Sequence, residues 1–181
     1  MSKSYFIADT HFGHNREFVY EARGCKSIDE HDSLLIEGIL GTVNHEDKLY
    51  ILGDLYFNDK YENILIKLNR NICVIQGNHD KSLYKNHNLF DNQRIKLVGH
   101  IYDTKINKTN ITMSHYPMMS WNMSHYGAWN LYGHVHGKKL PICGKQFDCQ
   151  PTANHMKPWS YEELIEIMET KPKNWDYIER N

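Results

Sequence analysis

The sequence has few of the features that mark nucleic-acid-binding or membrane proteins. Arginine occurs only five times, and 21 Lys and Arg residues against 22 Asp and Glu residues give a net charge of −1. This balance provides no broad positive surface for a long nucleic acid, although a nucleotide or a short strand stays compatible with it. The apolar runs reach only strand length, so we expect no membrane span.

Cysteine is also scarce, and no leader-like segment is visible. The four cysteines, at positions 25, 73, 143 and 149, form no C-x-x-C pair, so reduced thiols inside a cell are expected. Because the first four residues run directly into an apolar strand, we expect no signal peptide. A chain of 181 residues fits one well-buried domain. We therefore expect a single cytoplasmic domain over 1–181, of undetermined oligomeric state.

Histidine, in contrast, is abundant, with 12 residues, and several of them fall in five short motifs. The motifs are Asp9-Thr10-His11, Gly53-Asp54, Gly77-Asn78-His79-Asp80, Ser114-His115 and Gly133-His134-Val135-His136. Each of the first four follows a short apolar run of the kind that forms a buried strand. Because α/β sheets gather their ligands at strand ends, we expect these side chains to meet at one edge of a sheet.

The spacing within the motifs is typical of metal ligands. Asp9 and His11 are two residues apart, and positions i and i+2 share a face of an extended segment, so both can hold one ion. His134 and His136 have the same spacing, and the glycines on either side give the backbone freedom to turn. A carboxylate can bridge two cations, and two ions about 3.5–4 Å apart form a recurrent clamp for phosphoryl transfer. The pattern predicts a two-metal hydrolase.

Taken in order, the motifs D-x-H, G-D, G-N-H-D, H and G-H-x-H resemble the calcineurin-like metallophosphoesterase superfamily, in particular its small bacterial and phage members. The likeness extends from Asp9 to His136, and the segment that begins at Lys157 resembles the closing strand-to-helix segment of those proteins. It implies an α/β fold in which a two-sheet, mixed β-sandwich is flanked by helices.

The resemblance also implies a role for each motif residue. One metal would take Asp9, His11, Asp54 and His136, and the other would take Asp54, Asn78, His115 and His134, with Asp54 bridging. His79 falls at the position that is not a ligand and protonates the leaving oxygen. Elementary chemistry agrees, because water between two divalent ions becomes a hydroxide nucleophile near neutral pH and histidine can donate a proton there.

The mixed ligand set bears on the identity of the metal. Ligands that combine His, Asp and Asn suit Mn, Fe, Zn, Co or Ni better than Ca or Mg, which prefer oxygen alone. Similar enzymes are commonly supported by manganese, so we expect two divalent ions with Mn²⁺ favoured.

One position departs from the family pattern. Many phosphatases of this superfamily carry an Asp three residues after the G-D Asp, where it orients the acid His, but this chain has Phe57. Asn58, Asp59 and Asp80 are the candidates to replace it. The departure disfavours a protein phosphatase and leaves open what orients His79.

Candidate substrate contacts lie in the segments that follow two of the motifs. His14, Asn15 and Arg16 come after the first motif, and Tyr116 and His125 lie in the aromatic-rich segment that begins at a ligand. Aromatic rings there can stack a nucleobase or simply pack as a loop cover. Histidines outside the motifs are expected to be surface or hydrogen-bonded core residues; these are His31, His45, His87, His100 and His155.

The pattern of apolar residues predicts alternating elements without a linker. Strands are expected over 4–9, 48–53, 71–76, 129–133 and 145–150, with further strands from 94 to 114; helices are expected over 16–21, 28–40 and 59–69 and after Ser160. Ser27 with Glu30, and Ser160 with Glu163, have the spacing of capping boxes. The stripe of helix 28–40 is expected to be Leu34, Leu35, Ile39 and Leu40. The first half reads as βαβ units and the second as an antiparallel second sheet.

The sequence thus favours a phosphodiesterase acting on small, nucleotide-type phosphodiesters. Three alternatives stay open: a phosphomonoesterase acting on nucleotides or phosphoproteins, a nuclease, and a non-catalytic metal-binding scaffold. The balanced charge weakens the nuclease, and the retained His79 speaks against the scaffold. The connections between motifs are too short for a cap domain, so the site should be open to small substrates.

Overall fold

The structure, a computed structural model, describes residues 2–57, 64–85, 94–141 and 143–179. The strands are β1 (Ser4–Ile7), β2 (Lys48–Leu52), β3 (Asn71–Ile75), β4 (Ile95–Val98), β5 (Ile101–Ile106), β6 (Thr109–Ser114), β7 (Trp129–Tyr132), β8 (Gln146–Asp148) and β9 (Trp159–Ser160). The α-helices are α1 (Glu17–Tyr20), α2 (Ile28–Thr42), α3 (Ile64–Leu68), α4 (Lys81–Lys85) and α5 (Tyr161–Glu169). Short 3₁₀ helices are η1 (Glu21–Arg23), η4 (Ser124–Tyr126) and η5 (Pro151–Asn154).

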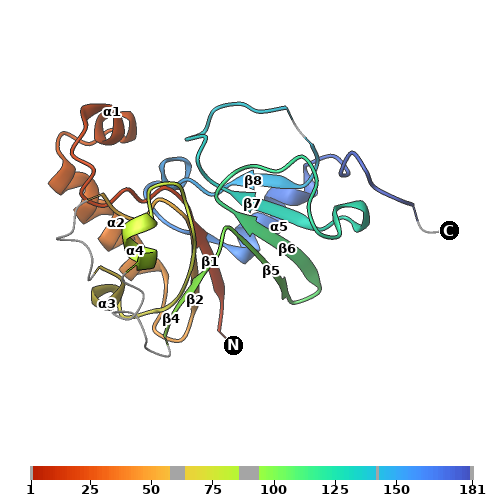
Figure 1. The fold of residues 1–181 in the computed structure, drawn as a ribbon, viewed down its shortest axis with the longest axis horizontal. Coiled ribbons are helices and arrows are strands. Elements are labelled where there is room, and N and C mark those ends of the chain that lie inside the picture. The colour runs from red at the N-terminus through yellow and green to blue at the C-terminus, as the bar shows by residue number, and fades with distance from the viewer. Residues whose placement is uncertain (1, 58–63, 86–93, 142, 180–181) are drawn as a thin grey trace.

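Two mixed sheets form the centre of the molecule. The first has the order β4-β3-β2-β1-β9, in which β1 to β4 are parallel and β9 is antiparallel to β1. The second has the order β5-β6-β7-β8, in which only the β5–β6 pair is antiparallel. The helices α2 and α3 lie beyond one face of the first sheet, and the second sheet lies on its other side (Figure 1). The expected α/β class with two mixed sheets flanked by helices is confirmed.

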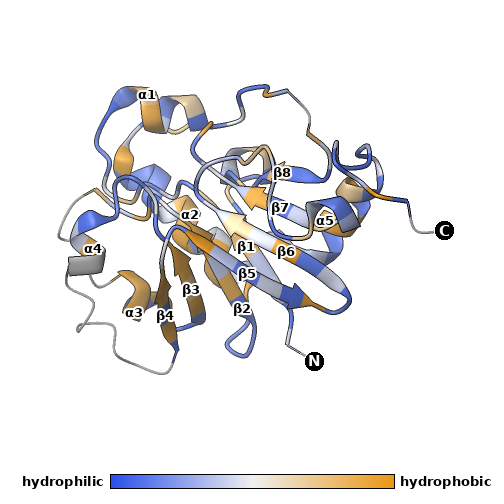
Figure 2. Ribbon diagram, turned by 45° about the vertical axis from the view of Figure 1, so that its right-hand side comes forward, coloured by the Kyte–Doolittle hydropathy of each residue, from blue (hydrophilic) through white to orange (hydrophobic). Residues whose placement is uncertain are grey.

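Alternation along the strands of the first sheet divides the core in two. Tyr5 and Ile7 point into a cluster with the buried faces of α2 and α3, whereas Phe6 and Ala8 point into a second cluster with the other sheet and α5. Strands β2 and β3 are buried at every position after their first residue, because helices cover one face of the sheet and the second sheet covers the other (Figure 2). Their carboxyl ends are therefore held rigidly where the polar motifs begin.

Several predicted elements differ from the structure. Strand β4 pairs with β3 in the first sheet, not in a second one, and β6, β7 and β8 are parallel, not antiparallel. In α2, Leu35 and Ile39 are buried as expected, but Leu34 and Leu40 are 41% and 42% exposed. The predicted stripe was therefore wrong at two of its four positions, because the buried face of the helix is completed by His31, Asp32 and Gly38.

The helix starts largely follow the prediction. Ser160 and Glu163 form the expected capping box at α5. Ser27 Oγ accepts a hydrogen bond from the Glu30 backbone N–H, but the Glu30 carboxylate accepts from the backbone of Lys26. The predicted helix 16–21 is split into α1 and η1. Of the predicted helix 59–69, residues 59–63 lie outside the described residues.

No helix in the described part of the chain combines the length and apolarity that crossing a bilayer would demand. The four cysteines are free and buried.

Candidate metal centre

The five sequence motifs lie at one edge of the two sheets. Asp9 follows β1, Asp54 follows β2, Asn78 follows β3, His115 follows β6 and His134 follows β7, each within three residues of the strand end. The structure thus brings the predicted ligands from both sheets together, as the placement of the motifs indicated.

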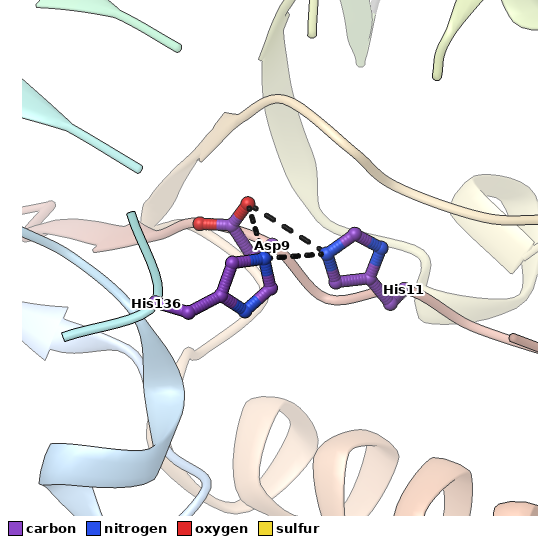
Figure 3. A group of neighbouring side chains, drawn as sticks. All are labelled: Asp9, His11 and His136. Carbon is purple, nitrogen blue, oxygen red and sulfur yellow. Dashed lines mark hydrogen bonds and ion pairs between the residues drawn. The ribbon is translucent and has the colours of Figure 1, made fainter. Parts of the chain in front are cut away.

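The first cluster consists of Asp9, His11 and His136 (Figure 3). The Nε2 atoms of His11 and His136 face each other at 3.3 Å, and each lies 3.7 Å from Asp9 Oδ1. Asp9 Oδ2 accepts a hydrogen bond of 2.9 Å from the backbone N–H of His134. Asp9 Oδ1, although buried, has no hydrogen-bond partner among the described residues. Three ligand atoms therefore converge on a space that no protein donor fills.

The second cluster is built around His115. Its Nδ1 lies 2.9 Å from the carbonyl oxygen of Leu52, which can only accept a hydrogen bond, so Nδ1 carries the hydrogen and donates it. The opposite nitrogen, Nε2, then lies 3.0 Å from Asn78 Oδ1 and 3.4 Å from Asp54 Oδ2. A lone pair that faces two oxygens is unfavourable unless a proton or a cation lies between them, so this arrangement suits a metal ion.

The backbone at the ligands is unusual. Positive φ angles occur at Asp9 (52°), His11 (49°), Asp54 (53°), His134 (71°) and His136 (50°). The left-handed region costs a residue other than glycine about 1–3 kcal/mol and is typical of functional sites. Our prediction that Asp9 and His11 share a face of an extended segment was wrong, because left-handed turns bring them together.

Glycine is needed at position 133 because of close packing there, and not because of a left-handed backbone conformation. Gly133 has no positive φ, but a Cβ there would overlap the Asp9 carboxylate and the Ala8 side chain. Only glycine allows the G-H-x-H segment to approach Asp9 so closely. Gly137, with φ of 75°, does adopt the left-handed turn that the sequence predicted.

The protonation states in the metal-free fold reflect burial of these groups. Burial raises the pKa of Asp9 to about 7. Burial, together with the charge of Arg23, lowers the pKa of His136 to about 4 and also lowers that of His11. For His115, burial acts downward, but the hydrogen bond and charge of Asp54 outweigh it and bring the pKa to about 9. His11 and His136 are thus neutral near pH 7, the form in which imidazole binds metals.

His79 lies at the mouth of this centre. Its backbone N–H donates a 3.0 Å hydrogen bond to Asp54 Oδ1, and its ring Nε2 lies 3.9 Å from Asp54 Oδ2. The side chain is 47% exposed, so it is accessible to a substrate. Neither group of metal-ligating atoms found in the described residues includes His79, and neither includes His134, which the sequence assigned as a ligand.

Phe57 packs against the ring of His79, where the family pattern places an Asp. The Phe57 ring centroid is 4.4 Å from that of His79, and on its other side Phe57 stacks on His14 at 3.7 Å, with an interplanar angle of 6°. Asp80 does not orient His79, because both of its oxygens accept backbone N–H groups. Asn58 and Asp59 lie outside the described residues. Among the described residues, the His79 ring is restrained by contact with the ring of Phe57, in addition to the Asp54 carboxylate at 3.9 Å from its Nε2.

Asp80 instead ties two ligand loops together. Its Oδ2 accepts from the backbone N–H groups of Asp54 and Gly77, and its Oδ1 accepts from Leu55. The side chain is 1% exposed. This role was missed by sequence reasoning, although Asp80 stands inside a motif.

A second supporting network holds the loop after β1. The Arg23 guanidinium donates to the carbonyl oxygens of Asp9 and Thr10 and to His31 Nε2. His31 Nδ1 in turn donates to Asp32, whose other oxygen accepts the Gly13 backbone N–H. His31 was expected to be a satisfied core or surface histidine, and it is buried and fully hydrogen-bonded. The only sequence signal for its role is its place on the buried face of α2.

The centre opens into a pocket of about 320 Å³, lined by His11, His14, Phe18, Val19, Asp54, Phe57, Asn78, His79, His134 and His136. His14 therefore lies at the site. Tyr116 contacts two residues of the site: its hydroxyl donates a 3.3 Å hydrogen bond to Asn78 Oδ1, and its ring packs on that of His134.

The other predicted substrate contacts are placed differently. Asn15 and Arg16 are exposed and do not line the pocket. His125 lies in η4, where its ring packs on Tyr126 and its carbonyl oxygen accepts the Ile178 N–H. No contact described for His125 is with a residue of the metal centre, because η4 packs against the segment after α5, where Asn174 and Asp176 bond to Ser124.

The donor set fits divalent metal ions. The unpartnered, buried Asp9 Oδ1 and the facing imidazole nitrogens are what a cation would satisfy. The oxygen and nitrogen chemistry suits a transition metal. Asp9 is the residue common to both groups of three, Asp9–His11–His136 and Asp9–Asp54–His115, whereas the sequence predicted that Asp54 bridges.

Comparison with known proteins gives relatives of undetermined activity. No model of a known protein family matches the chain. An uncharacterized protein from Methanocaldococcus jannaschii, MJ1445, is 28% identical over 182 residues, which cover 98% of this chain and 90% of that protein. The crystal structure of a protein of unknown function, AQ665 from Aquifex aeolicus, covers 92% of this chain and all of that one, with a TM-score of 0.70 and 24% identity. That likeness shows the fold alone.

Proposed function

We propose that this protein is a metal-dependent phosphoesterase of the calcineurin-like type that hydrolyses small phosphodiesters. The observation that carries the proposal is the buried Asp9 Oδ1, which faces the Nε2 atoms of His11 and His136 without a hydrogen-bond donor, next to the exposed ring of His79. A cation site beside an accessible acid is the combination that phosphoryl transfer to water needs.

The residues that would hold the metals are those that the motifs supply. One ion would take Asp9, His11, Asp54 and His136, and the other would take Asp54, Asn78, His115 and His134. When bound, divalent ions lower the pKa of water and neutralise the charge of phosphoryl oxygens. We propose Mn²⁺ as the metal, with Fe, Zn, Co and Ni as the alternatives that this donor set also accepts.

Side chains of the protein position the ligands and supply the proton for the leaving group. The hydrogen bond from His115 Nδ1 to Leu52 keeps Nε2 free for a ligand role, and Asp80 holds the Asp54 and Gly77 loops at a fixed separation. His79, kept against Phe57, donates its proton to the leaving oxygen as the phosphorus–oxygen bond breaks. The half-exposed position of His79 leaves room for an alcohol to depart.

A direct test is to strip the protein of metal, restore Mn²⁺, and assay bis-p-nitrophenyl phosphate beside p-nitrophenyl phosphate. Preference for the diester supports the phosphodiesterase, and preference for the monoester moves the proposal to a phosphomonoesterase. Metal content is measured on the same samples. If the protein binds two metals but hydrolyses neither ester nor a short oligonucleotide, it is a metal-binding scaffold and not an enzyme.

A further inference from the structure

A second pocket adjoins the metal centre and is not used by the proposed chemistry. It has a volume of about 380 Å³ and is lined by Phe18, Val19, Ala22, Arg23, His136, Lys138, Gln150 and Thr152. Phe18, Val19 and His136 also line the pocket at the metal centre, so the two pockets adjoin at these three residues. A substrate whose phosphate lies at the metals can therefore extend one substituent into the second pocket.

The lining is amphipathic. Phe18, Val19 and Ala22 supply the apolar part of the lining, and Phe18 is 71% exposed. The Phe18 ring has an edge-on contact with His14, at a centroid distance of 5.8 Å. An exposed ring at the rim of a pocket is a platform on which a nucleobase can stack.

The rest of the lining is polar and carries positive charge at Arg23 and Lys138. Lys138, Gln150 and Thr152 provide hydrogen-bond donors and acceptors for hydroxyl groups. Arg23 keeps its charge, since burial lowers its pKa only to about 10, but its guanidinium is committed to Asp9, Thr10 and His31. A ligand with both a flat ring and hydroxyl groups suits this mixed lining, and a nucleoside has both. The pocket volume is at the lower end of the range of small-ligand sites, about 300–1,000 Å³.

The position of His79 decides which substituent enters. His79 lines the pocket at the metal centre but not the second pocket. The leaving oxygen must point to His79 to receive its proton, so the second pocket faces the substituent that stays on phosphorus.

We propose that this second pocket, at Phe18, Ala22, Lys138 and Thr152, holds the retained nucleoside of a nucleotide phosphodiester; the proposal rests on the phosphoesterase function. Water adds to phosphorus, the bond to the leaving oxygen breaks, and that oxygen takes the His79 proton. The product in the pocket is then a nucleoside monophosphate, and the second product is an alcohol.

The test uses two esters with the same leaving group and different retained groups: thymidine 5′-(p-nitrophenyl phosphate) and methyl p-nitrophenyl phosphate. For the Mn²⁺-loaded protein we expect kcat/KM about tenfold or more higher for the thymidine ester, the size of one base-stacking contact. Thr152→Trp fills the pocket and should abolish this preference. Ala153→Trp is the matched control, since Ala153 is the next exposed residue and does not line the pocket.

A binding measurement separates this inference from the proposed catalysis. Thymidine 5′-monophosphate should bind the Mn²⁺-loaded protein about tenfold or more tighter than inorganic phosphate, and Thr152→Trp, but not Ala153→Trp, should remove the difference. Equal turnover of the two esters, or a preference that survives Thr152→Trp, overturns the nucleoside pocket and leaves the phosphoesterase intact. If neither ester is hydrolysed, the phosphoesterase fails, and the nucleotide-binding comparison alone supports or overturns the pocket.

Discussion

Two histidines at the same edge of the sheets would have opposite relations to bound metal ions. His115 Nε2 is buried between Asp54 and Asn78, where it has room only for a cation or a proton. His79 is half-exposed, and its ring is held by packing on Phe57. A ring contact restrains a side chain but accepts no proton from it, so Phe57 leaves both His79 nitrogens available to substrate and water.

We expect His79→Ala to keep both metals and to lose turnover, and Asp54→Ala to lose metal. General acids contribute about 100- to 10,000-fold, so the His79 variant should lose at least about 100-fold in kcat on a dinucleotide, whose alkoxide leaving group needs a proton. On p-nitrophenyl esters the loss should be much smaller, because p-nitrophenolate is a stable anion. Metal content per chain and kcat on both substrates are the measurements.

A drop in the metal content of His79→Ala to that of Asp54→Ala would make His79 a ligand and contradict the acid role. Equal losses on the two leaving groups would contradict it as well. His100→Ala is a useful control, because His100 is an exposed histidine whose ring contacts the Gln76 carbonyl rather than the centre.

At the scale of elements, Asp80 connects the loops after β2 and β3. Its carboxylate accepts hydrogen bonds from three backbone N–H groups of these loops. We expect Asp80→Asn to weaken Mn²⁺ binding about 10- to 100-fold, as losses around a metal site commonly do. Asparagine has one acceptor oxygen, and its NH₂ would face a backbone N–H, leaving buried donors unpaired. A Mn²⁺ titration measures the effect.

Asp29→Asn is the matched control, an exposed Asp-to-Asn change on α2 away from both loops. If the Asp80 and Asp29 variants bind Mn²⁺ equally well, the two loops hold their ligands without this connection.

The sequence predicted the strands better than it predicted how they pair in sheets. Short apolar runs followed by Asp, His or Asn predicted both the strands and the edge at which the ligands meet, because both signals are local. Pairing of β4 with β3 was not predicted, since sheet membership depends on partners distant in the chain. The parallel β6–β7 pair was hidden because its connection contains η4 and no α-helix, the usual sign of a parallel crossover.

Backbone conformation at the ligands was equally hidden. The residue types of Asp9 and His11 do not predict a positive φ. The backbone hydrogen bonds around them hold this conformation. The same holds for the network of Arg23 and His31, whose partners come from the loop after β1 and from α2.

For the whole molecule, the metal centre joins the two sheets, with Asp9 and Asp54 after the first sheet and His115 and His136 after the second. Cations bound there would link the sheets at their common edge, and any ligand that binds only the folded state stabilises it by mass action. At a free Mn²⁺ concentration about 100 times Kd the gain is about 2.7 kcal/mol, or a Tm increase of roughly 5–10 °C for a chain of this size.

We expect this Mn²⁺-induced increase in Tm to be larger at pH 8 than at pH 6.5. In the metal-free fold the pKa of His115 is raised to about 9, so its stabilising proton is fully present below the unfolded value of 6.5 and is lost as pH rises through 9. The pKa of Asp9 is raised from 3.8 to about 7, and its contribution disappears as pH rises through 7. His136, with a pKa lowered to about 4, is already neutral across this interval.

Metal-free protein should therefore unfold at a lower temperature at pH 8, whereas Mn²⁺ takes the place of both protons and keeps the loaded protein stable. Thermal unfolding in EDTA and in Mn²⁺ at the two pH values measures the difference, and a shift that is equal or smaller at pH 8 would mean that metal binding does not displace these protons.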